Sequence, residues 1–174
     1  MKEIKLTQGK VAFVDDEDFD ELNQHKWFAQ EIKYKDGTKQ YYAGRNVRCE
    51  IGNKRQKRVY MHRVILNTDG LVDHIDSNGL NNQRNNLRSA TSGQNVHNQK
   101  PKQNCTSKYK GVYLHIIKDK RYGREYPYWN ASIRVPGGKT LNLGDFKNEK
   151  EAALTYNEAA IKHFGEFAYL NDLD

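Results

Sequence analysis

The chain has 174 residues, of which 36% are hydrophobic and 29% charged, and its formal net charge is +7. A mean hydropathy of -1.00 argues against one large core, and a pI near 9.3 favours a polyanionic partner. No apolar run has the length of a signal peptide or membrane span, so we predict an intracellular, cytoplasmic protein without a membrane partner. Cys49 and Cys105 lie far apart without a CxxC pair, which argues against a zinc knuckle and a disulfide framework.

The first sixty residues predict short strands that alternate with turns. Asp36 and Gly37 form a pair that is typical of a tight hairpin turn. We expect a strand over residues 10–14, an acidic helix over 18–24 capped near Asp16 or Asp18, and a hairpin of strands 27–34 and 40–47.

The densest basic cluster comes next, before a strand predicted over residues 58–61. It allows two interpretations, a solvated hairpin tip or a ridge that contacts phosphates, and its members are Lys54, Arg55, Lys57 and Arg58. His62 and Arg63 then lead a short helix over residues 63–66. For His62 both a structural hydrogen-bonding role and a phosphate contact stay open.

Residues 72–98, VDHIDSNGLNNQRNNLRSATSGQNVHN, carry the candidate chemistry. Asp73 and His74 end a short apolar run, and a turn-rich loop follows. Residues 86–88 can form a second strand, after which Thr91 and Ser92 offer N-caps to a helix. The predicted unit is therefore strand, loop, strand, helix.

In such a unit, a carboxylate at the end of the first strand and an amide oxygen on the helix can share one small gap. Asp73 and Asn95 are those residues, and oxygen ligands suit Mg²⁺, or Mn²⁺, which keeps its other positions for water and phosphate oxygens. His74 projects from the opposite face of the strand, and an ordinary pKa near ~6.5 suits it to act as a general base.

A surface turn or a calcium-binding loop is the alternative interpretation. Asp73, Asp76 and Asn78 alternate somewhat like calcium ligands, but no bidentate Glu follows at the required spacing. A calcium loop also gives no reason for His74 or for Asn95 on a following helix. We therefore favour the nuclease-like interpretation and expect Asp76 to cap the loop.

These residues resemble the HNH endonucleases, which have a ββα-metal fold. The resemblance implies that Asp73 is the metal-binding carboxylate and His74 the general base. It further implies that Asn86 braces the loop that holds the base and that Asn95 is the last metal ligand. Many members have His at that last position; here His97 lies two residues later and is the next candidate.

Residues 99–107 break both helical and strand periodicity and are predicted to be a linker, and the pattern then changes to three strands and a helix. The strands are expected over residues 109–115, 128–135 and 139–146, and the helix over 149–164. Asn148 and Glu151 predict a capping box, and Gly165 predicts the helix end. Inward positions are expected for Trp129, Ala131, Ile133, Val135, Leu141 and Leu143, and an apolar helix stripe for Ala152, Ala153, Tyr156, Ala160 and Phe164.

This second pattern, with YKGVYLH, WNASIRV and LNLGDF before the helix, resembles the Apetala-type DNA-binding domain over residues 107–171. The family usually has more Arg and Trp at its DNA-facing sites. The resemblance places those sites at Lys110, Tyr113, His115, Asn130, Ser132, Arg134, Thr140 and Asn142.

We therefore expect an α+β protein: a β-rich N-terminal segment and HNH unit over residues 1–98 with a core of 60–98, a linker over 99–107, and a three-stranded antiparallel sheet packed on one helix over 108–174. The combination is similar to the phage-type HNH homing endonucleases. It implies a metal-dependent endonuclease that acts on double-stranded DNA without a small-molecule cofactor. A DNA-binding regulator with an inactive HNH unit and a small RNA-binding module are the alternatives, and the oligomeric state stays open.

Overall fold

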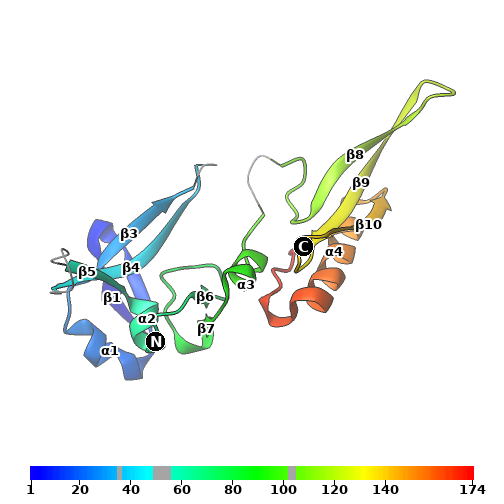
Figure 1. The fold of residues 1–174 in the computed structure, drawn as a ribbon. Helices are drawn as coiled ribbons and strands as arrows, with labels where there is room; N and C mark the ends of the chain where they lie inside the picture. Colours follow the sequence, from blue (N-terminus) through cyan, green and yellow to red (C-terminus); the bar gives the residue numbers. More distant parts are fainter. Residues whose placement is uncertain (35–36, 49–55, 102–104) are drawn as a thin grey trace. The chain divides into compact units, whose positions relative to one another are not determined.

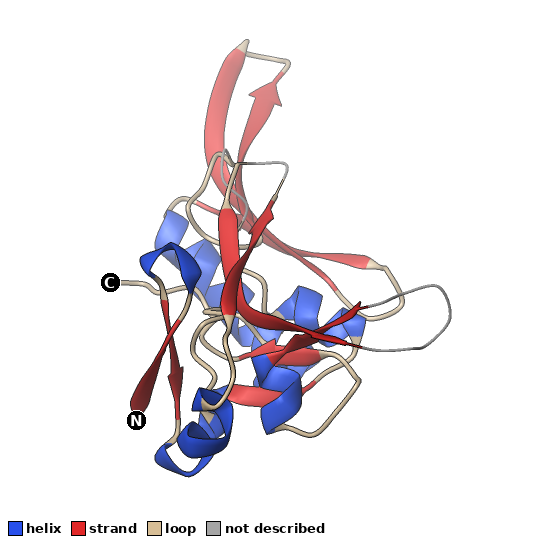
Figure 2. Cartoon of the chain, turned by 90° about the vertical axis from the view of Figure 1, so that its left-hand side faces the viewer, coloured by secondary structure: helices blue, strands red, loops and turns tan. Residues whose placement is uncertain are grey.

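The computed structural model describes residues 1–34, 37–48, 56–101 and 105–174, and it divides into two compact units, Met1–Asn95 and Val96–Asp174. Short helices and small antiparallel sheets alternate along the chain (Figures 1 and 2), so the α+β prediction is confirmed. Among the described residues, none of the helices has both the length and the apolar character of a membrane span. The predicted basic residues Lys54 and Arg55 lie outside the described ranges.

The described residues of the first unit form three small antiparallel sheets, the helices α1 and α2, and most of helix α3, whose last two residues belong to the second unit. Two sheets have two strands, β1 (Lys2–Lys5) with β2 (Val11–Val14) and β6 (Val72–His74) with β7 (Leu87–Ser89). The third has the order β3 (Phe28–Lys33), β4 (Lys39–Arg48), β5 (Gln56–Tyr60). The helices are α1 (Asp16–Asn23), α2 (Met61–Ile65) and α3 (Ser92–His97), with 3-10 turns η1 (Thr7–Gly9) and η2 (Arg84–Asn86).

Two helix starts and one strand differ from the predictions. Helix α1 follows Asp15, whose carboxylate makes no side-chain cap bond because it accepts from Gln83 and from the backbone of Arg84. Helix α2 begins at Met61, which is fully buried and therefore starts the helix inside the core. Asn86 lies in η2 and not in a strand.

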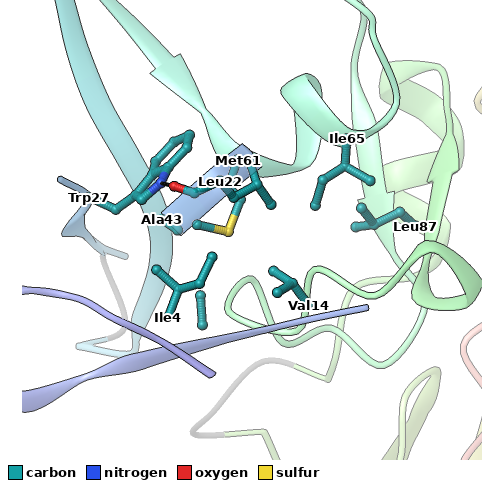
Figure 3. Close-up of a cluster of buried hydrophobic side chains, with 9 residues drawn as sticks. Ile4, Val14, Leu22, Trp27, Ala43, Met61, Ile65 and Leu87 are labelled. Atoms are coloured by element: carbon teal, nitrogen blue, oxygen red, sulfur yellow. Dashed lines mark hydrogen bonds between the residues drawn. The ribbon is translucent and has the colours of Figure 1, made fainter. Parts of the chain in front are cut away.

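One hydrophobic cluster joins the N-terminal segment to the β6–β7 hairpin (Figure 3). Leu87 of β7 is buried in it, and Val72 of β6 packs against it. The N-terminal segment and the hairpin therefore bury their apolar surface against each other. The buried members are Ile4, Ala12, Val14, Leu22, Trp27, Ala43, Met61, Ile65 and Leu87.

The second unit is a three-stranded antiparallel sheet on one long helix, as predicted. The sheet order is β10 (Thr140–Phe146), β9 (Arg124–Arg134), β8 (Val112–Asp119), and α4 (Glu149–Phe164) precedes the 3-10 turn η3 (Gly165–Phe167). Small alanines let α4 lie close to the sheet. Gly111 allows the same approach, because a Cβ there would lie 2.1 Å from Tyr156 Cδ2 and its φ is +76°. The buried core residues are Tyr109, Val112, Ala131, Ile133, Ala152, Ala153, Tyr156 and Ala160.

The strand and cap details differ in part from the predictions. Strand β8 begins at Val112, because Tyr109 is part of the core before the strand. Asn148 caps α4 by accepting from the Lys150 N–H at 2.8 Å, without the predicted reciprocal contact from Glu151. Gly165 ends α4 with φ +55°, a left-handed conformation that suits glycine.

Candidate active site

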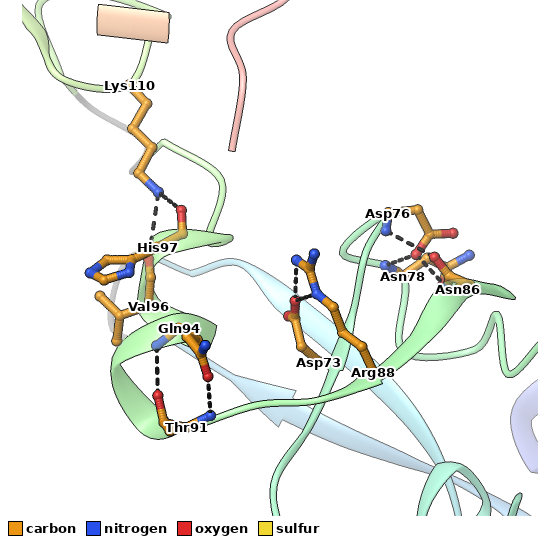
Figure 4. A network of polar contacts seen from close by, with 10 residues as sticks. All are labelled: Asp73, Asp76, Asn78, Asn86, Arg88, Thr91, Gln94, Val96, His97 and Lys110. Carbon is orange, nitrogen blue, oxygen red and sulfur yellow. Dashed lines mark hydrogen bonds and ion pairs between the residues drawn. The ribbon is translucent and has the colours of Figure 1, made fainter. Parts of the chain in front are cut away.

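Strands β6 and β7 place Asp73 directly opposite Arg88 and His74 opposite Leu87. The Arg88 guanidinium donates to Asp73 Oδ2 from Nε at 2.9 Å and from Nη2 at 2.6 Å (Figure 4). Both side chains are nearly buried, with exposed fractions of 11% for Arg88 and 9% for Asp73. Because water screens such a pair little, the guanidinium balances most of the carboxylate charge.

His74 lies in a buried, largely aromatic environment. Its Nε2 is 3.5 Å from Asn82 Oδ1, and its ring centroid is 5.1 Å from that of His62 and 5.8 Å from that of Tyr42. Burial lowers the pKa of His74, since the charged imidazolium is poorly solvated there. At neutral pH the ring is therefore unprotonated, the form that can accept a proton.

His62 has a packing role in this structure. Its ring stacks on Tyr60 with centroids 5.5 Å apart, and its buried Nδ1 has no hydrogen-bond partner among the described residues. Burial lowers the pKa of His62 to about 3, so it carries no charge for a phosphate. The described contacts of His62 are therefore aromatic, and a phosphate contact by this neutral ring stays a prediction.

The loop after β6 is braced by Asn86. Its Nδ2 donates to Asp76 Oδ1 at 2.9 Å and to the Asn81 carbonyl at 2.8 Å, while its Oδ1 accepts from the Asp76 N–H at 3.0 Å. Asp76 in turn accepts from the Asn78 N–H at 2.8 Å, so it caps the loop (Figure 4). These bonds fix the backbone that follows His74.

The N-terminal segment clamps the other end of the same loop. The Phe13 N–H donates to the Leu80 carbonyl at 2.9 Å, and the Asn82 N–H donates to the Phe13 carbonyl at 2.8 Å. The Arg84 N–H donates to Asp15 Oδ2 at 2.7 Å. Strand β2 therefore holds Asn82, which in turn contacts His74.

Helix α3 begins with a capping box at Thr91. The Thr91 N–H donates to Gln94 Oε1 at 2.8 Å, and the Gln94 N–H donates to Thr91 Oγ1 at 3.3 Å (Figure 4). One turn later, Asn95 Oδ1 is buried and has no hydrogen-bond partner among the described residues. An acceptor in that state suits a hard cation.

No three His, Cys, Asp or Glu side chains gather in the described parts of the chain in a way that could hold a metal ion. A cation at Asp73 would therefore depend on oxygens from amide groups, water and phosphate. His97 does not complete such a set, because it belongs to the second unit and stacks on Phe164 with centroids 3.8 Å apart.

The basic residues near α2 make contacts of their own. Lys57 Nζ lies 3.5 Å from Asp69, and Arg58 donates to Gln30 at 2.6 Å while its guanidinium lies over Phe28. Arg63 lies over the Tyr60 ring, and its Nε is buried. Lys57 and Arg58 remain exposed, so they can still meet a phosphate.

The outward face of the second sheet holds most of the DNA-facing candidates. The register pairs Tyr113 with Asn130, Asn142 with Ser132, and Thr140 with Arg134. Five side chains on this face are exposed and Ser132 is half-buried; the exposed ones are Tyr113, His115, Arg134, Thr140 and Asn142.

The predicted DNA contacts of Asn130 and Lys110 are corrected, because both side chains are turned to partners within their own unit. Asn130 is 1% exposed and donates to Asn142 at 3.0 Å and to Asp145 at 2.9 Å, so it supports the face from beneath. Lys110 Nζ donates to the carbonyls of His97 at 2.6 Å and Gln99 at 2.7 Å. Burial lowers the pKa of Lys110 to about 8, and the ammonium ties backbone segments of the second unit together.

Sequence reasoning missed three site residues. Asn82 contacts His74, and Arg88 pairs with Asp73. On the outward face of the second sheet, Asp145 accepts from His115 at 2.9 Å. Arg88 had a usable signal, because it lies in the strand that pairs with the Asp73 strand. Asn82 and Asp145 had none in the local pattern.

The chain is 32% identical over 171 residues to an uncharacterized HNH endonuclease of Acanthamoeba polyphaga mimivirus, which covers 96% of this chain and 78% of the relative. It is also 40% identical over 70 residues to dehydration-responsive element-binding protein 2E of Oryza sativa subsp. japonica, over 40% of this chain and 19% of the relative. It is 45% identical over 56 residues to dehydration-responsive element-binding protein 2C of Arabidopsis thaliana, a match that covers 32% of this chain and 15% of the relative. No family model matches the chain.

Proposed function

The chain belongs to the HNH endonucleases, and from this premise we propose that it is a metal-dependent enzyme that hydrolyses phosphodiester bonds of double-stranded DNA. In this proposal β6, β7 and α3 form a ββα-metal unit. The observation that carries it is the buried His74 beside Asp73, at the start of a loop that is hydrogen-bonded at both ends.

Asp73 and Asn95 would hold a Mg²⁺ or Mn²⁺ ion. The buried, unpartnered Oδ1 of Asn95 and the carboxylate of Asp73 fit the oxygen preference of such ions. When bound, the ion supplies Lewis-acid stabilisation of the charge on the phosphate and on the leaving 3′ oxygen.

His74 would act as general base in an in-line displacement. It takes a proton from water while the water oxygen forms its bond to phosphorus and the bond to the 3′ oxygen breaks. Asn82 and Asn86 keep His74 in place through its ring and through its loop. The low pKa of His74 keeps the ring unprotonated before each turnover.

The second unit would bind the duplex, and we propose the division of the chain into a nuclease unit, a linker over residues 99–107 and a DNA-binding domain over 108–174. The similarity to proteins named dehydration-responsive element-binding supports this assignment. Exposed Arg134, Thr140 and Asn142 on one sheet face offer hydrogen bonds to phosphates or base edges. Site preference of this kind would fit a homing endonuclease.

A DNA-binding regulator with an inactive nuclease unit is the second candidate. The ion pair between Arg88 and Asp73 favours it, because the guanidinium already neutralises the carboxylate that a metal ion needs. The two candidates share the DNA-binding face and differ in the chemistry at β6.

A plasmid-nicking assay separates them. Supercoiled DNA is incubated with the full chain in Mg²⁺, in Mn²⁺ and in EDTA, with His74→Ala as the matched control. We expect metal-dependent nicking by the wild type alone. If the wild type bound DNA but did not nick it in either metal, the DNA-binding regulator would be the remaining candidate function. Mapping the ends produced from a random-sequence duplex library then tests the homing proposal, since scattered ends would contradict it.

A further inference from the structure

Strands β8 and β9 continue as a two-stranded ribbon beyond the end of β10 (Figure 1). The β10 ladder ends at Phe146 opposite Trp129, whereas the β8–β9 ladder continues to Asp119 opposite Arg124. Pro127 of β9 lies just past the end of β10, and a proline has no N–H to donate to a strand ladder. The ribbon therefore comprises residues 115–119 and 124–128 and their turn, and four steps of ~3.3 Å give it a reach of ~13 Å.

One face of the ribbon continues the outward face of the sheet. Alternation along β9 puts Arg124, Tyr126 and Tyr128 on the same side as Ser132 and Arg134. Tyr126 and its cross-strand partner Ile117 are each 40% exposed. Ile116 on the opposite face is 46% exposed as well, so the charges of the ribbon and not its apolar residues distinguish the two faces.

The charges of the ribbon are arranged by face. Lys118 pairs with Glu125 at 2.7 Å, and both lie on the opposite side from Arg124. Arg124 is exposed and has no acidic partner in the described part of the chain. The Lys118–Glu125 ion pair is therefore on the far face, and Arg124 on the continued face is available to an external anion.

The turn adds two further cations. Lys120 and Arg121 are exposed, and the described residues hold no acidic partner for them. The Oδ1 atom of Asp119 accepts hydrogen bonds from the backbone N–H groups of Arg121 at 2.9 Å and Tyr122 at 3.3 Å. Three cations thus gather at the end of the ribbon, next to an exposed Tyr122.

We propose that the ribbon is a DNA-contacting arm that lengthens the bound duplex site. This inference rests on the proposed DNA binding by the second unit. The major groove admits a two-stranded β-ribbon, and a reach of ~13 Å corresponds to about four base pairs at ~3.4 Å each. Arg121 and Arg124 neutralise phosphates beyond the sheet, while Ile117 and Tyr126 contact sugars or thymine methyl groups.

The test compares DNA binding by the full-length Arg121→Ala/Arg124→Ala variant with that of its parent, both in the His74→Ala background so that cutting is slow. Random-sequence duplexes of about one and about three helical turns are the probes. Two further single variants, Arg124→Ala and Lys118→Ala, have the same charge change on opposite faces and form the matched pair. The exposed positions leave the core untouched, and circular dichroism checks the fold.

We expect Arg124→Ala to weaken binding to the longer duplex about threefold to tenfold and to lower the salt slope by about 0.9, with Lys118→Ala close to its parent. The hydroxyl-radical footprint of the double arginine variant should shorten at one end by about four base pairs.

Equal salt slopes and equal footprints for Arg124→Ala and Lys118→Ala would overturn the proposal of a DNA-contacting arm. A concentration-dependent dimer that Arg124→Ala dissolves would instead assign the ribbon to a second copy of the chain. If the His74→Ala parent bound no duplex at all, the proposed function would fail as well. If the double arginine variant bound DNA with a footprint of unchanged length, only the proposal of a DNA-contacting arm would fail.

Discussion

Arg88 donates two hydrogen bonds to Asp73 Oδ2 across the β6–β7 ladder, from Nε at 2.9 Å and from Nη2 at 2.6 Å. The pair links the proposed metal ligand to a cation of the chain itself. A divalent ion at Asp73 must share the carboxylate with this guanidinium, or the guanidinium must turn to the phosphate of the substrate. The strength of metal binding should therefore depend on Arg88.

Arg88→Gln should raise the apparent Mg²⁺ affinity about tenfold, because the competing positive charge is removed. The metal-free protein should lose on the order of 3 kcal/mol of stability, since Asp73 keeps its buried charge without its partner. Thermal unfolding with increasing Mg²⁺ measures both effects, and Arg88→Lys is the charge-preserving control. An Mg²⁺ affinity that does not change would show that Arg88 and the ion do not compete.

His74→Ala should lower the nicking rate by roughly 10² to 10⁴ and leave DNA affinity nearly unchanged, because a general base contributes to the chemical step. Since burial lowers the pKa of His74, the acid limb of the wild-type pH–rate profile should lie below the ordinary value of 6.5. Single-turnover nicking over a pH series measures this limb. Near-wild-type nicking by the alanine variant would remove His74 from the mechanism.

Asn95→Ala should abolish nicking at practical Mg²⁺ concentrations, because it removes the buried oxygen that has no other partner. Asn95→Asp keeps an oxygen ligand and should retain activity, with a shift in preference towards Mn²⁺. Isothermal titration with each metal ion gives a readout that is independent of cleavage. Full activity of Asn95→Ala would move the ligand role to another residue.

His62→Phe tests the buried imidazole through the pH dependence of stability. The pKa of His62 is about 3 in the folded chain and 6.5 ordinarily, so the unfolded chain takes up the proton first as the pH falls. The wild type should lose up to ~1.4 kcal/mol of unfolding free energy per pH unit between these values from this group. Urea unfolding at several pH values should show a shallower loss for His62→Phe, which keeps the stack on Tyr60; identical slopes would contradict the buried neutral state.

Lys110→Met and Arg134→Ala should have opposite effects. Lys110 donates to carbonyls within its own unit, so its loss should cost about 1–3 kcal/mol of stability and leave DNA affinity within about twofold. Arg134 is exposed on the outward face, so its loss should leave stability unchanged and weaken binding by ~1 to 3 kcal/mol if it contacts a guanine edge. Thermal unfolding and fluorescence anisotropy of both variants test the assignment, and a reversed pattern would refute it.

The order strand, loop, strand, helix around Asp73 was predictable from the sequence, because each step depends on neighbouring residues. Thr91 meets Gln94 three residues later, and Asn86 closes a loop on Asp76 ten residues earlier. The alternation around Ala131 and Ile133 likewise identified the face that packs on α4. Turns, caps and alternation are short-range, so the local pattern contains them.

The contacts that complete both candidate sites join residues that are distant in the sequence, and only the tertiary structure decided them. His62 meets His74, Phe13 holds Asn82, and Arg88 neutralises Asp73. Burial of Asn130 and Lys110 also depends on neighbours from other strands and loops. The sequence by itself thus determined which residues could do the chemistry, while long-range packing determined their charge state and partners, because burial and pairing depend on which segments meet in space.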